Sequence, residues 1–230
     1  MEVYHGAPLA RSRDGGAGTE REAFFLWNER GRYGTLEMMW LSFLVGLAFA
    51  KPPQTEAERL QALDDVYERF DFGFPKVDAI DAKTLRSRLQ TDDSVLLVDV
   101  RPVEERQVSM LPGAISLEEY EARRATTPEA VAGKTVVTYC TVGVRSGFAA
   151  NKLRKDGVEV LNFRGSILGW THEGGALVTP AGEATRQVHV YGKRWDFAAD
   201  GYEPVITDRS GAVELTRPRE SNSVESTREE

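Results

Sequence analysis

The sequence predicts an α/β fold in which helices cover a small parallel β-sheet. Two continuous apolar runs, Val95–Val98 and Val136–Tyr139, have the composition of strands that are buried on both faces. Segments with helical spacing of apolar residues, Ala82–Leu89 and Ser146–Lys155, alternate with these runs. Because ligands bind at the carboxyl ends of parallel strands, the residues that follow the two runs are candidates for function.

Composition and charge limit the function classes. At 230 residues the chain can form one domain of ordinary size with additional segments. Its formal net charge is -7 and it has no long basic run, so we expect no nucleic-acid partner. The only cysteine is Cys140. An internal disulfide framework and a thiolate-rich zinc site each need several sulfur atoms, so we expect neither, and no metal site.

The first 50 residues predict a poorly structured extension that ends in a signal-peptide-like apolar segment, residues 38–50. Thirteen helical residues span roughly 20 Å, which is less than the bilayer core of about 30 Å, so no stable membrane span is expected. Small residues at Ala48 and Ala50 fit a cleavage site, and we expect export to the periplasm or secretion. A membrane anchor, or a short buried helix of a cytoplasmic protein, remain alternatives.

Residues 51–75 predict an amphipathic helix and a linker. Thr55 and Glu58 have the spacing of a capping box, so the helix should begin there. An apolar stripe at spacings of three and four should pack on the main domain. The stripe consists of Leu60, Leu63, Val66, Tyr67 and Phe70.

The main domain is expected over residues 76–178. Val77–Ile80 predicts a short strand, Asp81 caps the following helix, and Val158–Phe163 predicts a further strand. Residues 179–206 form a C-terminal extension that contains a short strand at Val188–Tyr191, over the sheet or the site. Residues 207–230 are polar and predict a disordered tail.

The loop that follows Tyr139 carries the chemistry. A buried strand ends at Cys140 and a helix is expected about five residues later, so backbone N–H groups should turn inward and bind an anion. Gly143 allows a positive φ, Arg145 adds a positive charge, and Ser146 is expected to cap the helix. These features should lower the pKa of the Cys140 thiol. The other loop residues are Thr141, Val142 and Val144.

The loop resembles the active-site loop of the rhodanese superfamily, with its pattern Cys140-x-x-Gly143-x-Arg145-Ser146. Earlier residues stand where that family has its Asp-x-Arg and Pro-Gly-Ala motifs, and the resemblance covers residues 76–178. It identifies the chain as a single-domain member. The matching residues are Asp99, Arg101, Glu105, Pro112, Gly113 and Ala114.

The resemblance implies a sheet of five parallel strands, flanked by helices on both faces, and a sulfurtransferase. Cys140 would take a sulfane sulfur from a small donor such as thiosulfate and pass it as a persulfide to a thiol, to a cyanide-like acceptor or to an acceptor protein. Cys140 and Arg145 are the catalytic candidates, and the rest of the loop binds the anion. No metal or organic cofactor is implied. Asp99 and Arg101 are expected to support the site structurally.

Two other functions stay open. The domain could be a sulfur carrier or a redox-sensing module for a partner protein. A cysteine-dependent phosphatase is the second alternative, but related phosphatases place five residues between Cys and Arg, whereas four separate Cys140 and Arg145. His172 and His189 are too distant in sequence from Cys140 to be assigned as a base, and His172 is expected at the surface or in a hydrogen bond.

Overall fold

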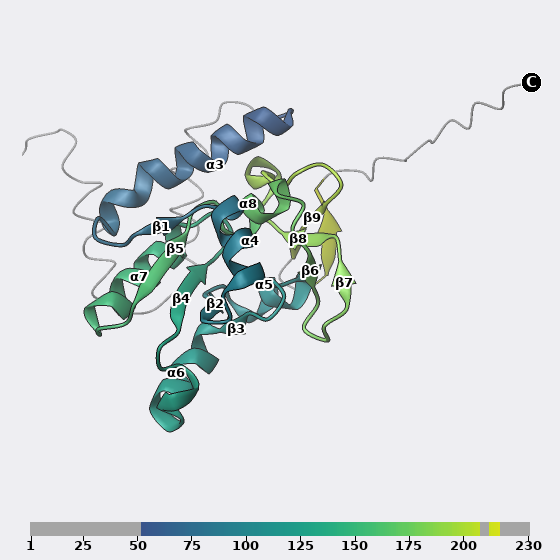
Figure 1. Cartoon of the computed structure of the whole chain (residues 1–230). Coiled ribbons are helices and arrows are strands. Elements are labelled where there is room, and N and C mark those ends of the chain that lie inside the picture. The colour runs from purple at the N-terminus through teal and green to yellow at the C-terminus, as the bar shows by residue number, and fades with distance from the viewer. Residues whose placement is uncertain (1–51, 208–211, 217–230) are drawn as a thin grey trace, which may run out of the picture. The chain divides into compact units, whose positions relative to one another are not determined.

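The computed structural model describes residues 52–207 and 212–216, and its centre is a five-stranded sheet. The strand order is β1-β5-β4-β2-β3, and every pair is parallel (Figure 1). The predicted α/β fold with a five-stranded parallel sheet is therefore confirmed. The strands are β1 (Ala79–Ile80), β2 (Val95–Asp99), β3 (Ile115–Ser116), β4 (Thr135–Tyr139) and β5 (Val160–Phe163).

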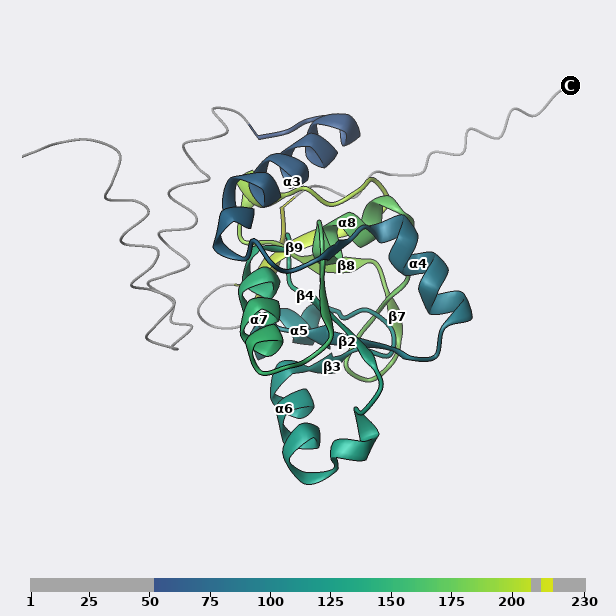
Figure 2. The same cartoon turned by 60° about the vertical axis from the view of Figure 1, so that its left-hand side comes forward.

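Helices cover both faces of this sheet. Helices α6 and α7 lie on one face, and α4 and α8 lie on the other, as the two views in Figures 1 and 2 show. Such coverage explains why β2 and β4 are apolar on both faces. The helices are α3 (Glu56–Phe70), α4 (Ala82–Thr91), α5 (Val103–Val108), α6 (Leu117–Thr126), α7 (Val144–Lys155) and α8 (Ser166–His172).

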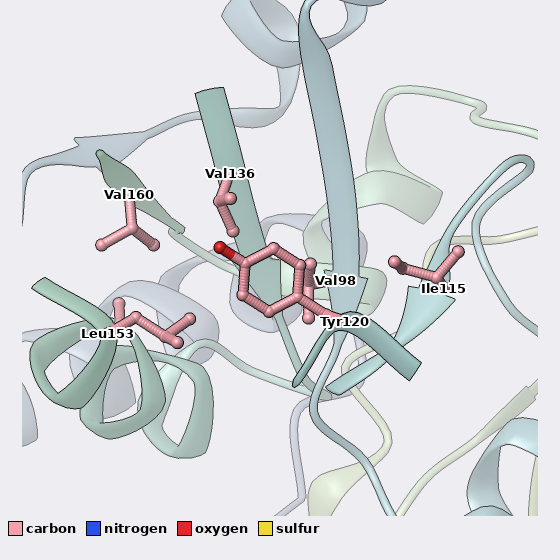
Figure 3. Close-up of a cluster of buried hydrophobic side chains, with 7 residues drawn as sticks. Val98, Ile115, Tyr120, Val136, Leu153 and Val160 are labelled. Carbon is pink, nitrogen blue, oxygen red and sulfur yellow. The ribbon is translucent and has the colours of Figure 1, made fainter. Parts of the chain in front are cut away.

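The core beneath α6 and α7 is built from alternate residues of neighbouring strands. Val98, Val136 and Val160 come from β2, β4 and β5, and all point to the same face (Figure 3). Tyr120 of α6 and Leu153 of α7 cover them. Burial of an aliphatic side chain of this size contributes about 1.5–3 kcal/mol, so this layer fixes α7 against the strand that carries the candidate cysteine.

Helix α3 begins with the predicted capping box. The Glu58 amide donates to Thr55 Oγ1 at 3.2 Å, and the Thr55 amide donates to Glu58 Oε2 at 3.1 Å. The predicted apolar stripe is buried except for Leu60, which is 44% exposed, so the prediction was wrong at that residue. The stripe packs α3 against α7 and α8 of the main domain.

Replacing Thr55 with alanine should lower the free energy of unfolding by about 1 kcal/mol. The change removes the side-chain acceptor of the Glu58 amide at the start of α3. Urea unfolding measures the loss. Thr91→Ala, which removes a hydroxyl that donates to the Ser87 carbonyl at the end of α4, is the control and should cost less. Equal losses in the two variants would contradict the capping role.

The C-terminal extension forms additional strands and joins the core. β8 pairs in parallel with β9, and β10 pairs antiparallel with β9. Val188, Val190 and Phe197 are fully buried. The predicted disordered tail is wrong for Thr207, the last residue of β9, and for residues 213–215, which form β10 because the edge of β9 offers them backbone partners. The remaining strands of the described chain are β6 (Leu177–Val178), β7 (Ala184–Thr185), β8 (Gln187–His189), β9 (Glu203–Thr207) and β10 (Val213–Leu215).

Several predictions lie outside the described residues. They concern the extension over residues 1–50, the apolar segment 38–50 with its signal peptide, and the tail beyond residue 216. In the described ranges, every helix is too short or too polar to cross a bilayer.

Candidate active site

The Cys140 loop connects β4 to α7. β4 ends at Tyr139, and α7 begins at Val144, two residues earlier than predicted. Gly143 is the N-cap, and its φ of 103° lies in the left-handed region that glycine tolerates best. The predicted capping role of Ser146 is therefore wrong, because Ser146 lies within the first turn of the helix. A left-handed glycine cap, rather than a hydroxyl cap, begins α7.

The sulfur of Cys140 is buried in a ring of hydrogen-bond donors. The side chain is 1% exposed, the Gly143 amide donates to Sγ at 3.2 Å, and Ser146 Oγ lies 3.6 Å from Sγ. Amides of α8 fix the loop from the other side, since Ile167 and Leu168 donate to the carbonyls of the two residues at its start. Of the predicted inward-facing N–H groups, the Gly143 amide is the one seen to donate to the sulfur.

These contacts lower the pKa of the Cys140 thiol. Burial is the largest influence and raises the pKa, because it removes water from the thiolate. The positive charge of Arg145 and the hydrogen bonds from Ser146 and Gly143 act in the opposite direction and together outweigh burial. The thiolate is the nucleophilic form of cysteine, so the loop prepares Cys140 for reaction.

Asn162 of β5 orients Ser146, although the sequence analysis did not select it. Ser146 Oγ donates to Asn162 Oδ1 at 2.7 Å, and Asn162 Nδ2 donates to the Gly143 carbonyl at 2.9 Å and to Tyr67 Oη at 3.3 Å. The amide thus joins the loop, α7 and α3. A buried asparagine in an otherwise apolar strand was the signal for this site, because a buried polar group requires partners.

Arg145 is engaged in a buried ion pair with Glu105 of α5. Its Nη1 and Nη2 donate to the two carboxylate oxygens at 2.8 and 2.9 Å. Nη2 also donates to Thr141 Oγ1 at 2.9 Å, and this hydroxyl donates to Glu105 Oε2 at 2.9 Å. The guanidinium therefore acts on Cys140 through its charge, while its hydrogen bonds go to protein groups.

The C-terminal extension contacts this ion pair. The guanidinium carbon of Arg145 lies 4.9 Å from the centre of the Tyr191 ring, and Tyr191 Oη lies 3.3 Å from Thr141 Oγ1. His189 Nδ1 lies 3.9 Å from Glu105 Oε2. Burial lowers the pKa of His189 more than the Glu105 carboxylate raises it, so the imidazole is uncharged at neutral pH. The extension was predicted to lie over the sheet or over the site, and these contacts place it over the site.

Comparison with known proteins agrees with this geometry. The family model of the rhodanese-like domain matches residues 81–173. A sulfurtransferase of Allochromatium vinosum is 37% identical over 109 residues, which cover 46% of this chain and 99% of that protein. The chain belongs to the rhodanese-like family. The predicted resemblance is confirmed.

The chain is also similar to proteins of other bacteria. A Bacillus subtilis protein whose name also contains the word sulfurtransferase is 26% identical over 102 residues, which cover 43% of this chain and 94% of that protein. Among solved structures, the thiosulfate sulfurtransferase of Pseudomonas aeruginosa has a TM-score of 0.41 and 24% identity, and the match covers 49% of this chain and 22% of that one.

In the rhodanese-like domain, Asp99 and Arg101 form a second buried ion pair. Arg101 Nε donates to Asp99 Oδ1 at 2.9 Å, and its Nη2 donates to Asp99 Oδ2 at 2.7 Å. Arg101 Nη2 also donates to the Ser109 carbonyl at 2.6 Å. The pair therefore connects the end of β2 to the segment that leads into β3.

The remaining candidates occupy different positions. Val142 and Val144 are buried and apolar, so only their backbone groups can serve an anion. His172 lies away from the loop, where its ring bonds Glu56 and the Phe197 carbonyl, so the hydrogen-bonding alternative predicted for it is confirmed. Local sequence patterns assign no site role to four residues that lie around the loop, Glu105, Asn162, His189 and Tyr191.

Glu105 should make the stability of the protein sensitive to acid. Burial raises its pKa, but the charges of Arg145 and Arg101 outweigh burial and lower the pKa from 4.5 to about 2. Since the folded pKa is the lower one, the stabilisation is complete above pH 4.5 and is lost as the pH falls towards 2. The loss is on the order of 3 kcal/mol.

Urea unfolding between neutral pH and pH 3 measures this dependence. Glu105→Gln should flatten the acid side of the stability curve, because the amide does not titrate. Glu119→Gln, which removes a carboxylate of an exposed ion pair on α6, is the control and should leave the curve nearly unchanged. Parallel curves for the parent protein and Glu105→Gln would show that Glu105 does not carry the effect.

Proposed function

We propose that this rhodanese-like protein is a sulfurtransferase in which Cys140 carries the sulfur as a persulfide. The observation that supports it is a buried cysteine whose Sγ accepts a hydrogen bond from the Gly143 amide at 3.2 Å and whose pKa is lowered. Such a thiolate can attack the sulfane sulfur of a donor. The sulfurtransferase name of the Allochromatium vinosum relative points to the same chemistry.

The proposed cycle has two transfers. The Cys140 thiolate forms a bond to the outer sulfur of the donor, and the donor's own bond to that sulfur breaks, so the leaving group departs with the electron pair. The acceptor then attacks the outer sulfur of the persulfide and releases the Cys140 thiolate. Amide groups of the loop and the charge of Arg145 stabilise the terminal sulfur anion between the two steps. The cycle needs no metal or organic cofactor.

Burial favours a second candidate, a sulfur carrier that serves one partner protein. Cys140 is 1% exposed, and Tyr191 of the extension lies against Arg145 and Thr141 of the loop. With Cys140 buried to this extent, a donor or acceptor needs local movement of the site to reach the sulfur. A carrier would form the persulfide readily but would pass its sulfur slowly to small acceptors. An enzyme would form the persulfide and would also pass its sulfur readily to small acceptors.

Mass spectrometry of the full-length protein tests the proposal. Incubation with thiosulfate or with a small hydropersulfide should add one sulfur atom to the parent protein and none to Cys140→Ser. Subsequent cyanide should remove the sulfur as thiocyanate. Persulfide formation followed by slow release of the sulfur would support the sulfur-carrier function. Hydrolysis of an aryl phosphate without sulfur uptake would instead support the phosphatase alternative and exclude both sulfur functions.

A further inference from the structure

Two buried ion pairs lie beside the Cys140 loop, and in each a carboxylate balances the positive charge of an arginine. Glu105 bonds both terminal nitrogens of Arg145, and Asp99 bonds Arg101. His189, the next titratable side chain at Glu105, is uncharged at neutral pH. The two pairs therefore add no net charge to the site, and the Cys140 thiolate keeps its negative charge there.

Three of the five N–H bonds of Arg145 also have protein acceptors. Nη1 and Nη2 donate to Glu105, Nη2 also donates to Thr141, and one face of the guanidinium lies against Tyr191. Of its five N–H bonds, the one at Nε is buried and has no partner among the described residues. An anionic donor would thus meet a guanidinium whose charge is already paired with a carboxylate and whose terminal nitrogens already donate to protein groups.

We propose that Glu105 determines the donor specificity of the site, so that Cys140 is loaded from hydropersulfides of low charge in preference to the thiosulfate dianion. This inference rests on the proposed sulfur transfer at Cys140. A dianion placed next to the thiolate would bring three negative charges together in a buried site where Arg101 and Arg145 are already paired with carboxylates. Repulsion between such charges is strong where water is excluded.

Loading of Cys140 from a hydropersulfide does not bring three negative charges together. The Cys140 thiolate attacks the outer sulfur of R–S–S–H, a new S–S bond forms at Cys140, and the S–S bond of the donor breaks. The electron pair stays with the leaving R–S group, which takes up the proton that the outer sulfur loses. The persulfide anion at Cys140 carries the single negative charge that the thiolate carried before, and no oxidant or reductant is required.

Loading rates of the full-length protein test the role of Glu105. Thiosulfate and hydroxyethyl hydropersulfide are the two donors, and the gain of one sulfur atom at Cys140 is followed by mass spectrometry. Glu105→Gln frees the charge of Arg145, so the ratio of the thiosulfate rate to the hydropersulfide rate should rise by about tenfold or more. Glu119→Gln, in the exposed pair with Arg123, is the control and should leave the ratio unchanged. An unchanged ratio in folded Glu105→Gln overturns the inference.

A second comparison needs no variant and decides the question if Glu105→Gln does not fold. Hydroxyethyl and sulfonatoethyl hydropersulfides have the same reacting sulfurs and differ in the charge of the substituent. The parent protein should be loaded by the neutral donor about fivefold or more faster than by the anionic one. Equal loading rates would contradict the inferred donor specificity but would not contradict the proposed sulfur transfer at Cys140. If none of the three donors loads Cys140, the proposed function itself fails.

Discussion

Replacing Arg145 with methionine should destabilise the protein by about 3–5 kcal/mol and raise the pKa of the Cys140 thiol. The substitution leaves the Glu105 carboxylate buried without its cation. It also removes the positive charge that, after the opposing effect of burial, is the largest influence on the thiol. Denaturant unfolding measures the first effect, and the pH dependence of alkylation measures the second. Because Cys140 is the only cysteine, the alkylation rate reports on this thiol alone.

The double variant Arg145→Met with Glu105→Gln is the control for this prediction. It removes both charges of the pair, so part of the lost stability should return, as expected when a buried ion pair is replaced as a unit. The thiol pKa should stay raised, since the cation is still absent. If the single variant alkylates with the same pH profile as the parent protein, Arg145 does not set the thiol pKa.

Replacing Gly143 with alanine should reduce sulfur loading of Cys140 by about a hundredfold, the effect of losing one well-placed anion donor. Gly143 has a φ of +103°, and an added Cβ would lie 2.9 Å from Tyr67 Cδ2. Relief of that contact moves the Gly143 amide away from Sγ, to which it donates. Backbone strain at such a position costs about 1–3 kcal/mol as well. Loading rate and urea unfolding provide the two measurements.

Gly157→Ala is the matched control. Gly157 also has a positive φ, +80°, but an added Cβ there would meet no atom within 4 Å. This variant should lose about 1 kcal/mol of stability and keep its loading rate. An equal loss of loading in both variants would mean that general destabilisation, rather than displacement of the amide, causes the effect at Gly143.

The sequence predicted the parts of the site that depend on local patterns. The apolar runs of β2 and β4 need no information beyond their own residues, and the capping box of α3 is defined by Thr55 and Glu58 alone. The start of α7 was misplaced because Gly143 serves at once as a loop glycine and as the helix cap, whereas a hydroxyl residue is the more common cap.

Contacts between distant segments could not be predicted in the same way. Glu105 precedes Arg145 by 40 residues and Asn162 follows Ser146 by 16, yet both make direct hydrogen bonds to the loop or its helix. The side chain of Tyr191 reaches Thr141 across 50 residues. No periodicity or cap signal relates such positions, because their proximity results from how the sheet and the extension fold together.

Two tyrosines outside the matched segment, residues 81–173, complete the surroundings of the loop. Tyr67 of α3 receives a hydrogen bond from Asn162 and lies where a side chain on Gly143 would have to go. Tyr191 of the extension packs on Arg145. The segment that sequence similarity detects is therefore shorter than the segment whose side chains surround the Cys140 loop. A chimera carrying only the matched segment would keep the groups that lower the pKa of Cys140 but would lose the two tyrosines that pack around the loop.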